Sequence, residues 1–186
     1  MMGGLGRNWR LAPALLLAAG VGCASASDGG PVAEGRERAL AEALRDLPGD
    51  PDPGEARLLA ATALATTAEL FSEYRPLRPP LLGNFAFHLG LRERALCCHW
   101  VEDLLRSLAA LGIRSYELHW VVAFHGNRWR EHSAVLARPL GAPPGQGLIL
   151  DPWRHSGRLY WVRAQDDRYP WRLHPSDAMR LRLRCG

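Results

Sequence analysis

The sequence has no apolar run long enough to cross a membrane and no side-chain spacing typical of a metal site. A membrane-spanning helix needs about 20 consecutive apolar residues, whereas the apolar run near the N-terminus extends only from Leu11 to Gly22. Closely spaced ligand pairs, such as C-x-x-C or H-x-x-x-H, are absent from the 186 residues. We therefore expect neither a metal nor a cofactor.

Lysine is also absent, so all 23 basic residues are arginines, set against 19 acidic residues for a net charge of +4. The arginines are spread along the chain, and those at 180, 182 and 184 alternate with leucine as in a strand. Nucleic-acid binding would require basic residues clustered on one face with aromatic residues between them. The charge pattern therefore argues against a nucleic-acid partner.

The N-terminus has the layout of a secretory signal, because two arginines precede the short apolar run. Two processing sites fit residues 1–26. Ala24-Ser25-Ala26 matches a small-x-small site for signal peptidase I, and Val21-Gly22-Cys23 resembles a bacterial lipoprotein signal in which Cys23 becomes the lipidated first residue. Both interpretations predict an exported bacterial protein. It would be periplasmic or extracellular in the first case, and anchored to a membrane through Cys23 in the second.

Residues 27–34 predict a flexible tether, and residues 35–186 predict a single domain. Hydrophobic periodicity comes first at helical spacing and then alternates as in strands. The expected helices are 35–47, 55–74 and 97–111, and the expected strands are 116–123, 131–138, 148–151, 159–162 and 179–184. Helices followed by an antiparallel meander predict an α+β fold, with the N-terminal helices packed on one face of the sheet.

The helix expected at 97–111 begins with two thiols, Cys97 and Cys98. Its apolar stripe is formed by Cys97, Trp100, Val101, Leu104, Leu108 and Leu111, and Gly112 follows its end. Unpaired backbone N–H groups and the helix dipole at a helix N-terminus both favour a thiolate, the reactive form of cysteine. The start of this helix is therefore a candidate site for nucleophilic chemistry.

The cysteine count leaves the disulfide pattern open. If Cys23 belongs to the signal, three cysteines remain: Cys97, Cys98 and Cys185. In an oxidising compartment this odd number fits one free thiol and one disulfide, such as Cys98 to Cys185. The alternative is three buried reduced thiols.

A thiol nucleophile requires a base, and the base requires a third group that orients it. His132 begins one expected strand and Asp151 ends the next. These two positions are symmetric about the Gly141–Pro144 connection, which predicts that they lie directly opposite each other across a hairpin. The carboxylate of Asp151 would then hold the His132 imidazole in one tautomer.

Four short stretches together resemble the transglutaminase-like branch of the papain-type cysteine enzymes. They are Cys97-Cys98-His99-Trp100, Leu111-Gly112-Ile113, His132-Ser133-Ala134-Val135 and Leu150-Asp151-Pro152-Trp153. The resemblance implies a papain/transglutaminase-like core. It also implies a Cys-His-Asp triad that cleaves or transfers an amide of a peptide or protein through a thioester.

The resemblance assigns the nucleophile to Cys97, with Cys98 as the alternative, because an aromatic residue follows Cys97 at plus three and a glycine at plus fifteen. His132 would transfer the proton, and Asp151 would orient the His132 ring. Trp100 and Trp153 would contact the substrate, and the backbone N–H of the nucleophile would bind the oxyanion. The competing hypotheses are a non-catalytic envelope binding or scaffold protein on the same fold, and a disulfide-linked structural domain.

Overall fold

The computed structural model describes residues 31–80, 96–127 and 130–175. Within these ranges the chain has an α+β fold with three α-helices and a five-stranded antiparallel sheet. The helices are α1 (Pro31–Arg45), α2 (Pro53–Tyr74) and α4 (Cys97–Ala109); the strands are β1 (Tyr116–Ala123), β2 (His132–Pro139), β3 (Leu148–Asp151), β4 (Tyr160–Arg163) and β5 (Arg172–Leu173). No helix in the described ranges is both long and apolar enough to span a bilayer.

Local sequence accounts for the start and end of α2. The carboxylate of Asp52 accepts a hydrogen bond from the Glu55 N–H at 2.8 Å, which satisfies a backbone donor that the first turn leaves unpaired. Pro53 occupies the first helical position, where its missing N–H costs nothing. Arg75, directly after the helix, has a φ of 42° and adopts the left-handed conformation that commonly ends helices.

The helix α4 follows the predicted stripe and buries it between α2 and the sheet. Trp100, Val101, Leu104 and Leu108 are each fully buried, and α4 packs against β1, β2 and α2. The helix ends two residues earlier than expected, at Ala109, and Gly112 follows with a φ of 64°.

The strands lie in the order β4-β3-β2-β1-β5, and all pair antiparallel. Neighbouring segments of the chain therefore form successive hairpins from β1 to β4, as the meander predicts. The short β5 pairs with β1 at the other edge, where Val121 is opposite Leu173. Sequence periodicity missed β5 because two residues are too few to show alternation.

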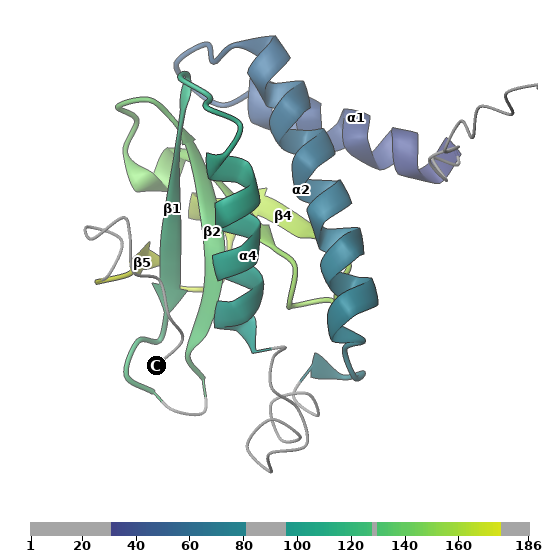
Figure 1. The fold of residues 1–186 in the computed structure, drawn as a ribbon. Coiled ribbons are helices and arrows are strands. Elements are labelled where there is room, and N and C mark those ends of the chain that lie inside the picture. Colours follow the sequence, from purple (N-terminus) through teal and green to yellow (C-terminus); the bar gives the residue numbers. More distant parts are fainter. Residues whose placement is uncertain (1–30, 81–95, 128–129, 176–186) are drawn as a thin grey trace, which may run out of the picture.

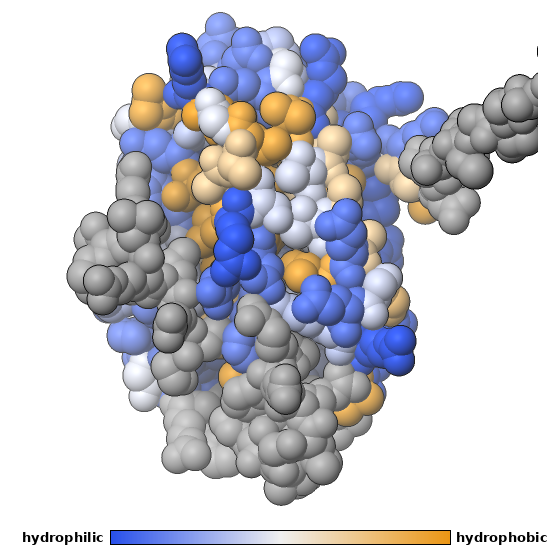
Figure 2. Space-filling view, in the orientation of Figure 1, coloured by the Kyte–Doolittle hydropathy of each residue, from blue (hydrophilic) through white to orange (hydrophobic). Residues whose placement is uncertain are grey.

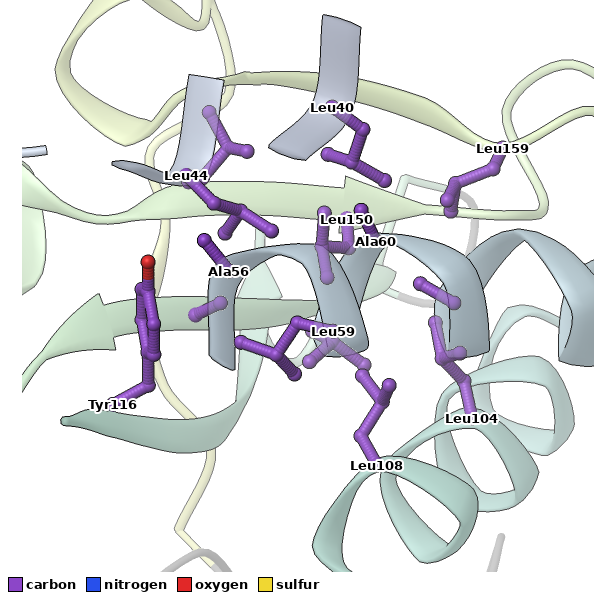
Figure 3. Packing of buried hydrophobic residues seen from close by; sticks show 14 of the residues in the cluster. Leu40, Leu44, Ala56, Leu59, Ala60, Leu104, Leu108, Tyr116, Leu150 and Leu159 are labelled. Atoms are coloured by element: carbon purple, nitrogen blue, oxygen red, sulfur yellow. The ribbon is translucent and has the colours of Figure 1, made fainter. Parts of the chain in front are cut away.

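The helices cover one face of this sheet, and the main core lies between them (Figures 1 and 3). Each helix and each of the three central strands contributes to it. Its fully buried members include Leu40, Leu44, Leu59, Ala60, Leu104, Leu108 and Val135, with Leu148 and Leu150 from β3. A smaller apolar cluster formed by Val121, Ala134, Leu136 and Ile149 lies on the other face. On the face of the molecule that Figure 2 shows, many coloured side chains are hydrophilic, and apolar side chains gather near the upper centre of the view.

Most predicted boundaries differ from the structure by no more than two residues, but the start of α1 differs by four. The tether was expected to extend to Glu34, but α1 already begins at Pro31. A proline in the first turn and the acidic Glu34 close behind it both favour a helix start, which explains the earlier beginning. The strand expected at 179–184 lies outside the described residues.

Candidate active site

Three side chains that are distant in the sequence meet at one end of the sheet. Cys97 begins α4, His132 begins β2 and Asp151 ends β3. Because β2 and β3 are antiparallel, the start of one strand and the end of the other lie at the same end of the sheet. Figure 1 shows α4 beginning at this end as well, in the lower part of the view. The fold thus brings together the three residues that the sequence singled out.

His132 and Asp151 form a buried pair, with Nε2 of the ring 2.6 Å from Oδ2 of the carboxylate. Their side chains are 5% and 0% exposed. The prediction of directly opposite positions was wrong by two residues, because the observed register sets Val135 opposite Leu150. The connection contains a 3-10 turn at Pro144–Gln146, which makes it asymmetric. A shift of two residues keeps side chains on the same face of the sheet, so the two groups meet diagonally.

The thiol of Cys97 completes the arrangement from the helix side. Cys97 is free and partly buried, and its side chain lies close enough to the His132 ring for their interaction to raise the pKa of the imidazole. Since Nε2 of this ring faces Asp151, Nδ1 is the nitrogen left for the sulfur. The imidazole therefore lies between a sulfur and a carboxylate, each of which can accept a proton from one of its nitrogens.

Interactions within this group shift the pKa values of both His132 and Asp151. Burial by itself would lower the pKa of His132, but hydrogen bonds to Asp151 and Cys97 and the charges of these groups outweigh burial and raise it to about 10. Burial would likewise raise the pKa of Asp151, yet the hydrogen bond from His132 and the charges of His132 and Arg154 hold it below its ordinary value. The site therefore favours a charged imidazolium beside an ionised carboxylate.

Backbone and side-chain donors surround the carboxylate of Asp151. Oδ1 accepts the backbone N–H groups of Trp153 and Arg154 at 3.1 and 3.0 Å. Oδ2 accepts Arg154 Nε at 2.9 Å in addition to the His132 ring. This turn follows from Asp-Pro at the end of the strand, since an aspartate readily accepts from N–H groups two and three residues ahead. The carboxylate is thus held by four donors.

Arg154 extends the arrangement beyond the predicted triad. Its terminal nitrogens lie 3.2 and 2.7 Å from the two carboxylate oxygens of Asp167, in the bidentate geometry that arginine favours. Asp167 also accepts Trp171 Nε1 at 2.9 Å. We call Cys97, His132, Asp151, Arg154 and Asp167 the polar chain. Sequence reasoning missed Arg154 and Asp167, although an arginine three residues after a buried aspartate was a usable signal.

Aromatic rings enclose the imidazole of His132. The ring centroids of Trp153, Tyr169 and Trp171 lie 4.9, 5.5 and 5.7 Å from that of His132. Trp153, predicted to contact the substrate, is partly buried, and its ring lies beside the His132 imidazole. These rings limit the access of water to the His132–Asp151 hydrogen bond, which strengthens it.

The prediction that Trp100 contacts a substrate was wrong. Its side chain is fully buried and packs edge-on against Tyr74, with ring centroids 4.9 Å apart. Trp100 lies on the stripe of α4 that faces the protein interior, so the aromatic residue three places after the thiol is a core residue. His99 is 8% exposed, and its Nδ1 accepts the Leu96 N–H at 3.3 Å.

The two neighbouring cysteines differ in oxidation state. Cys98 is disulfide-bonded, whereas Cys97 is a free thiol. The residues predicted for lipidation and for the disulfide, Cys23 and Cys185, lie outside the described residues. Within the described ranges, no group of three or more histidine, cysteine or acidic side chains could hold a metal ion.

Comparison with known proteins gives no relative: no protein family, no curated protein and no solved structure matches this chain.

Proposed function

We propose that this chain is a cysteine-dependent acyl hydrolase or acyltransferase of the transglutaminase-like type, built on a papain-like core. The observation that carries the proposal is the position of the His132 ring, whose Nε2 lies 2.6 Å from Oδ2 of Asp151 and whose pKa is raised by the neighbouring Cys97 thiol. A nucleophile, a base and an orienting carboxylate in hydrogen-bond contact are the minimum set for covalent acyl transfer.

In the proposed reaction, the Cys97 thiolate attacks the carbonyl carbon of an amide in a peptide or protein. The backbone N–H of Cys97, at the N-terminus of α4, would stabilise the oxyanion. When the C–N bond breaks, the imidazolium of His132 gives its proton to the departing amine, and a thioester remains on the sulfur. Water or a second amine then attacks the thioester while His132 takes up the proton, which releases an acid or a new amide.

Asp151 orients the base in this scheme. Its carboxylate accepts from Nε2 of His132, which leaves the other ring nitrogen for proton exchange with the sulfur. The raised pKa of His132 keeps the imidazolium populated near neutral pH, and an imidazolium beside a thiol favours the thiolate. The carboxylate and the sulfur act on opposite nitrogens of the same ring.

Cys97 is the proposed nucleophile in preference to Cys98. Cys97 has the free thiol and interacts with His132, whereas the sulfur of Cys98 is in a disulfide. The export signal proposed for residues 1–26 would place the enzyme in the bacterial cell envelope, soluble or anchored through Cys23. Envelope peptides and proteins are therefore the proposed acyl donors.

Alkylation of Cys97 by iodoacetamide tests the proposal directly. We expect Cys97 to react quickly at about pH 6 and His132→Ala to slow the reaction about a hundredfold, the usual contribution of a positioned base. His155→Ala, which removes an exposed imidazole outside the triad, is the matched control and should leave the rate unchanged. A rate that is insensitive to His132→Ala would support the non-catalytic binding or scaffold protein instead.

Mass spectrometry can detect the covalent intermediate. After incubation with a mixture of envelope peptides, we expect an acyl adduct on Cys97 that hydroxylamine removes, because hydroxylamine cleaves thioesters. Cys97→Ser should form no such thioester. Loss of peptide amide bonds without added amine would indicate hydrolysis, and incorporation of an added amine would indicate transfer.

A further inference from the structure

Two adjoining hollows lie between α1, α2 and the 153–160 segment, away from the thiol. Their volumes are about 410 and about 590 Å³, within the range of about 300–1,000 Å³ that small-molecule sites occupy. Both are lined by Arg36, Arg78, Arg158 and Leu159, so they form one continuous groove. Neither is lined by Cys97, His132 or Asp151.

The groove is strongly basic, and the described residues around it do not balance its charge. Among the residues that the structure describes, no acidic side chain lines either hollow. Within the described ranges, Arg36, Arg78 and Arg158 form no ion pair with a carboxylate. The fourth arginine at the groove, Arg154, is already paired with Asp151 and Asp167.

Positive charges held together without a counter-ion are unfavourable. Arg36 is partly buried, its Nη2 donates to the Leu159 carbonyl at 2.6 Å, and its guanidinium lies 4.8 Å from the centre of the Trp161 ring. Burial and the charge of Arg158 both lower the pKa of Arg36, so each guanidinium feels the other. A bound anion would relieve this repulsion, and the planar fork of arginine matches carboxylates and phosphates.

The wall of the groove formed by α2 is largely apolar, in contrast to the arginine cluster beside it. Leu64, Ala68 and Phe71 line the smaller hollow, and Phe71 is 41% exposed. Gly157 allows the loop to approach this wall, since an added Cβ would come within 2.4 Å of the Phe71 ring. An apolar surface directly beside a cluster of arginines fits a ligand with two ends.

We infer that this groove binds an amphiphilic anion, with its carboxylate or phosphate held by Arg36, Arg78 and Arg158 and its apolar part along Leu64, Ala68 and Phe71. Arg154 of the polar chain lines the larger hollow, but Cys97, His132 and Asp151 line neither, and the inference does not depend on the proposed acyl chemistry. A small molecule is the occupant that fits, because the two hollows have the volume of a small-molecule site.

Isothermal titration calorimetry with four short probes tests the ligand class. We expect octanoate, octyl phosphate or both to bind, and octanol and inorganic phosphate to bind at least about tenfold more weakly because each lacks one end. The tighter of the two anions identifies the head group. Octanol binding as tightly as the anions, or no anion binding below about 10 mM, would overturn the inference.

Substitutions test the location. Arg158 is exposed, and among the described residues only its backbone N–H makes a hydrogen bond, to the His155 carbonyl. Arg158→Gln should therefore fold normally and weaken anion binding about tenfold, the loss expected for one charge-assisted contact. Arg36→Gln should also weaken anion binding about tenfold, and its melting temperature should be measured to check that the variant is folded. Arg38→Gln, an exposed arginine on the same helix that lines neither hollow, is the matched control. Unchanged affinity in Arg158→Gln, or an equal loss in Arg38→Gln, would refute the assignment.

Phe71→Ala separates the two ends of the groove. It should weaken octanoate binding several-fold, because it removes apolar contact area, while leaving the affinity for inorganic phosphate unchanged. Equal loss for both probes would contradict the proposed orientation.

Discussion

The helix-covered face of the sheet and the end that carries the polar chain are both buried, yet they are stabilised by different interactions. The first is packed with aliphatic side chains such as Leu59 and Leu104, both fully buried, whose contributions add up contact by contact. The second is a series of charged groups in which Asp151 depends on His132 and Arg154, and Arg154 depends on Asp167. Loss of one member there leaves its neighbour buried without a partner.

The largest expected effect breaks the polar chain at its centre. Asp151→Ala removes the partner of His132 and Arg154, and we expect the free energy of unfolding to fall by about 3–5 kcal/mol, as for other broken buried ion pairs. Urea denaturation followed by circular dichroism measures it. Asp166→Ala, an exposed aspartate, should change the free energy of unfolding by less than about 0.5 kcal/mol. If Asp151→Ala and Asp166→Ala lowered the free energy of unfolding equally, the members of the polar chain would not depend on one another.

The apolar face should respond to loss of volume. Leu59→Ala removes a fully buried side chain, and we expect a loss of about 2–4 kcal/mol from lost burial and the cavity left behind. The adjacent Leu58 is 45% exposed, so Leu58→Ala should cost well under about 1 kcal/mol. If both variants unfolded at the same urea concentration, α2 would not face the sheet as described.

The pH dependence of stability distinguishes the two regions, because His132 of the polar chain titrates whereas the aliphatic side chains of the core do not. The pKa of His132 is raised in the folded protein, so its stabilising contribution is complete below the unfolded value of 6.5 and is lost as pH rises towards about 10. Across this window, the difference in unfolding free energy between the wild type and His132→Gln should fall by up to about 1.4 kcal/mol per pH unit. A difference that stays constant would show that His132 is not held as an imidazolium.

The smallest expected effect comes from charges that water screens. Arg106 lies 3.0 Å from Glu102 and 2.5 Å from Asp103, but its side chain is 66% exposed. Arg106→Gln should therefore lower the free energy of unfolding by less than about 1 kcal/mol, and added salt should shrink the difference. A loss as large as that of Asp151→Ala would remove the distinction between buried and exposed ion pairs.

Periodicity predicted the helices and most strands, because core-facing side chains recur at fixed spacing. The α4 stripe and the α+β order of elements follow from it directly. The register of β2 and β3 was displaced by two residues, since it depends on the shape of the connection around Pro144–Gln146, which hydrophobic spacing does not encode.

The candidate site was predictable as far as its residue types mark chemistry. Cys97, His132 and Asp151 were named from the sequence, whereas Arg154 and Asp167 were missed because their pairing joins two loops. The sequence predicted that Trp100 contacts a substrate, because its position three residues after the thiol fits a binding face as well as the core. Burial decides between these alternatives, and it becomes visible only in the folded chain.

The carboxylate of Asp151 accepts four donors, all of them from the protein itself. Under the proposed function, the imidazole would therefore be aligned before a substrate arrives, and no binding energy would have to be spent on assembling the base. For the proposed chemistry, this pre-organisation means that even a small electrophile with no peptide portion should meet a fully prepared nucleophile.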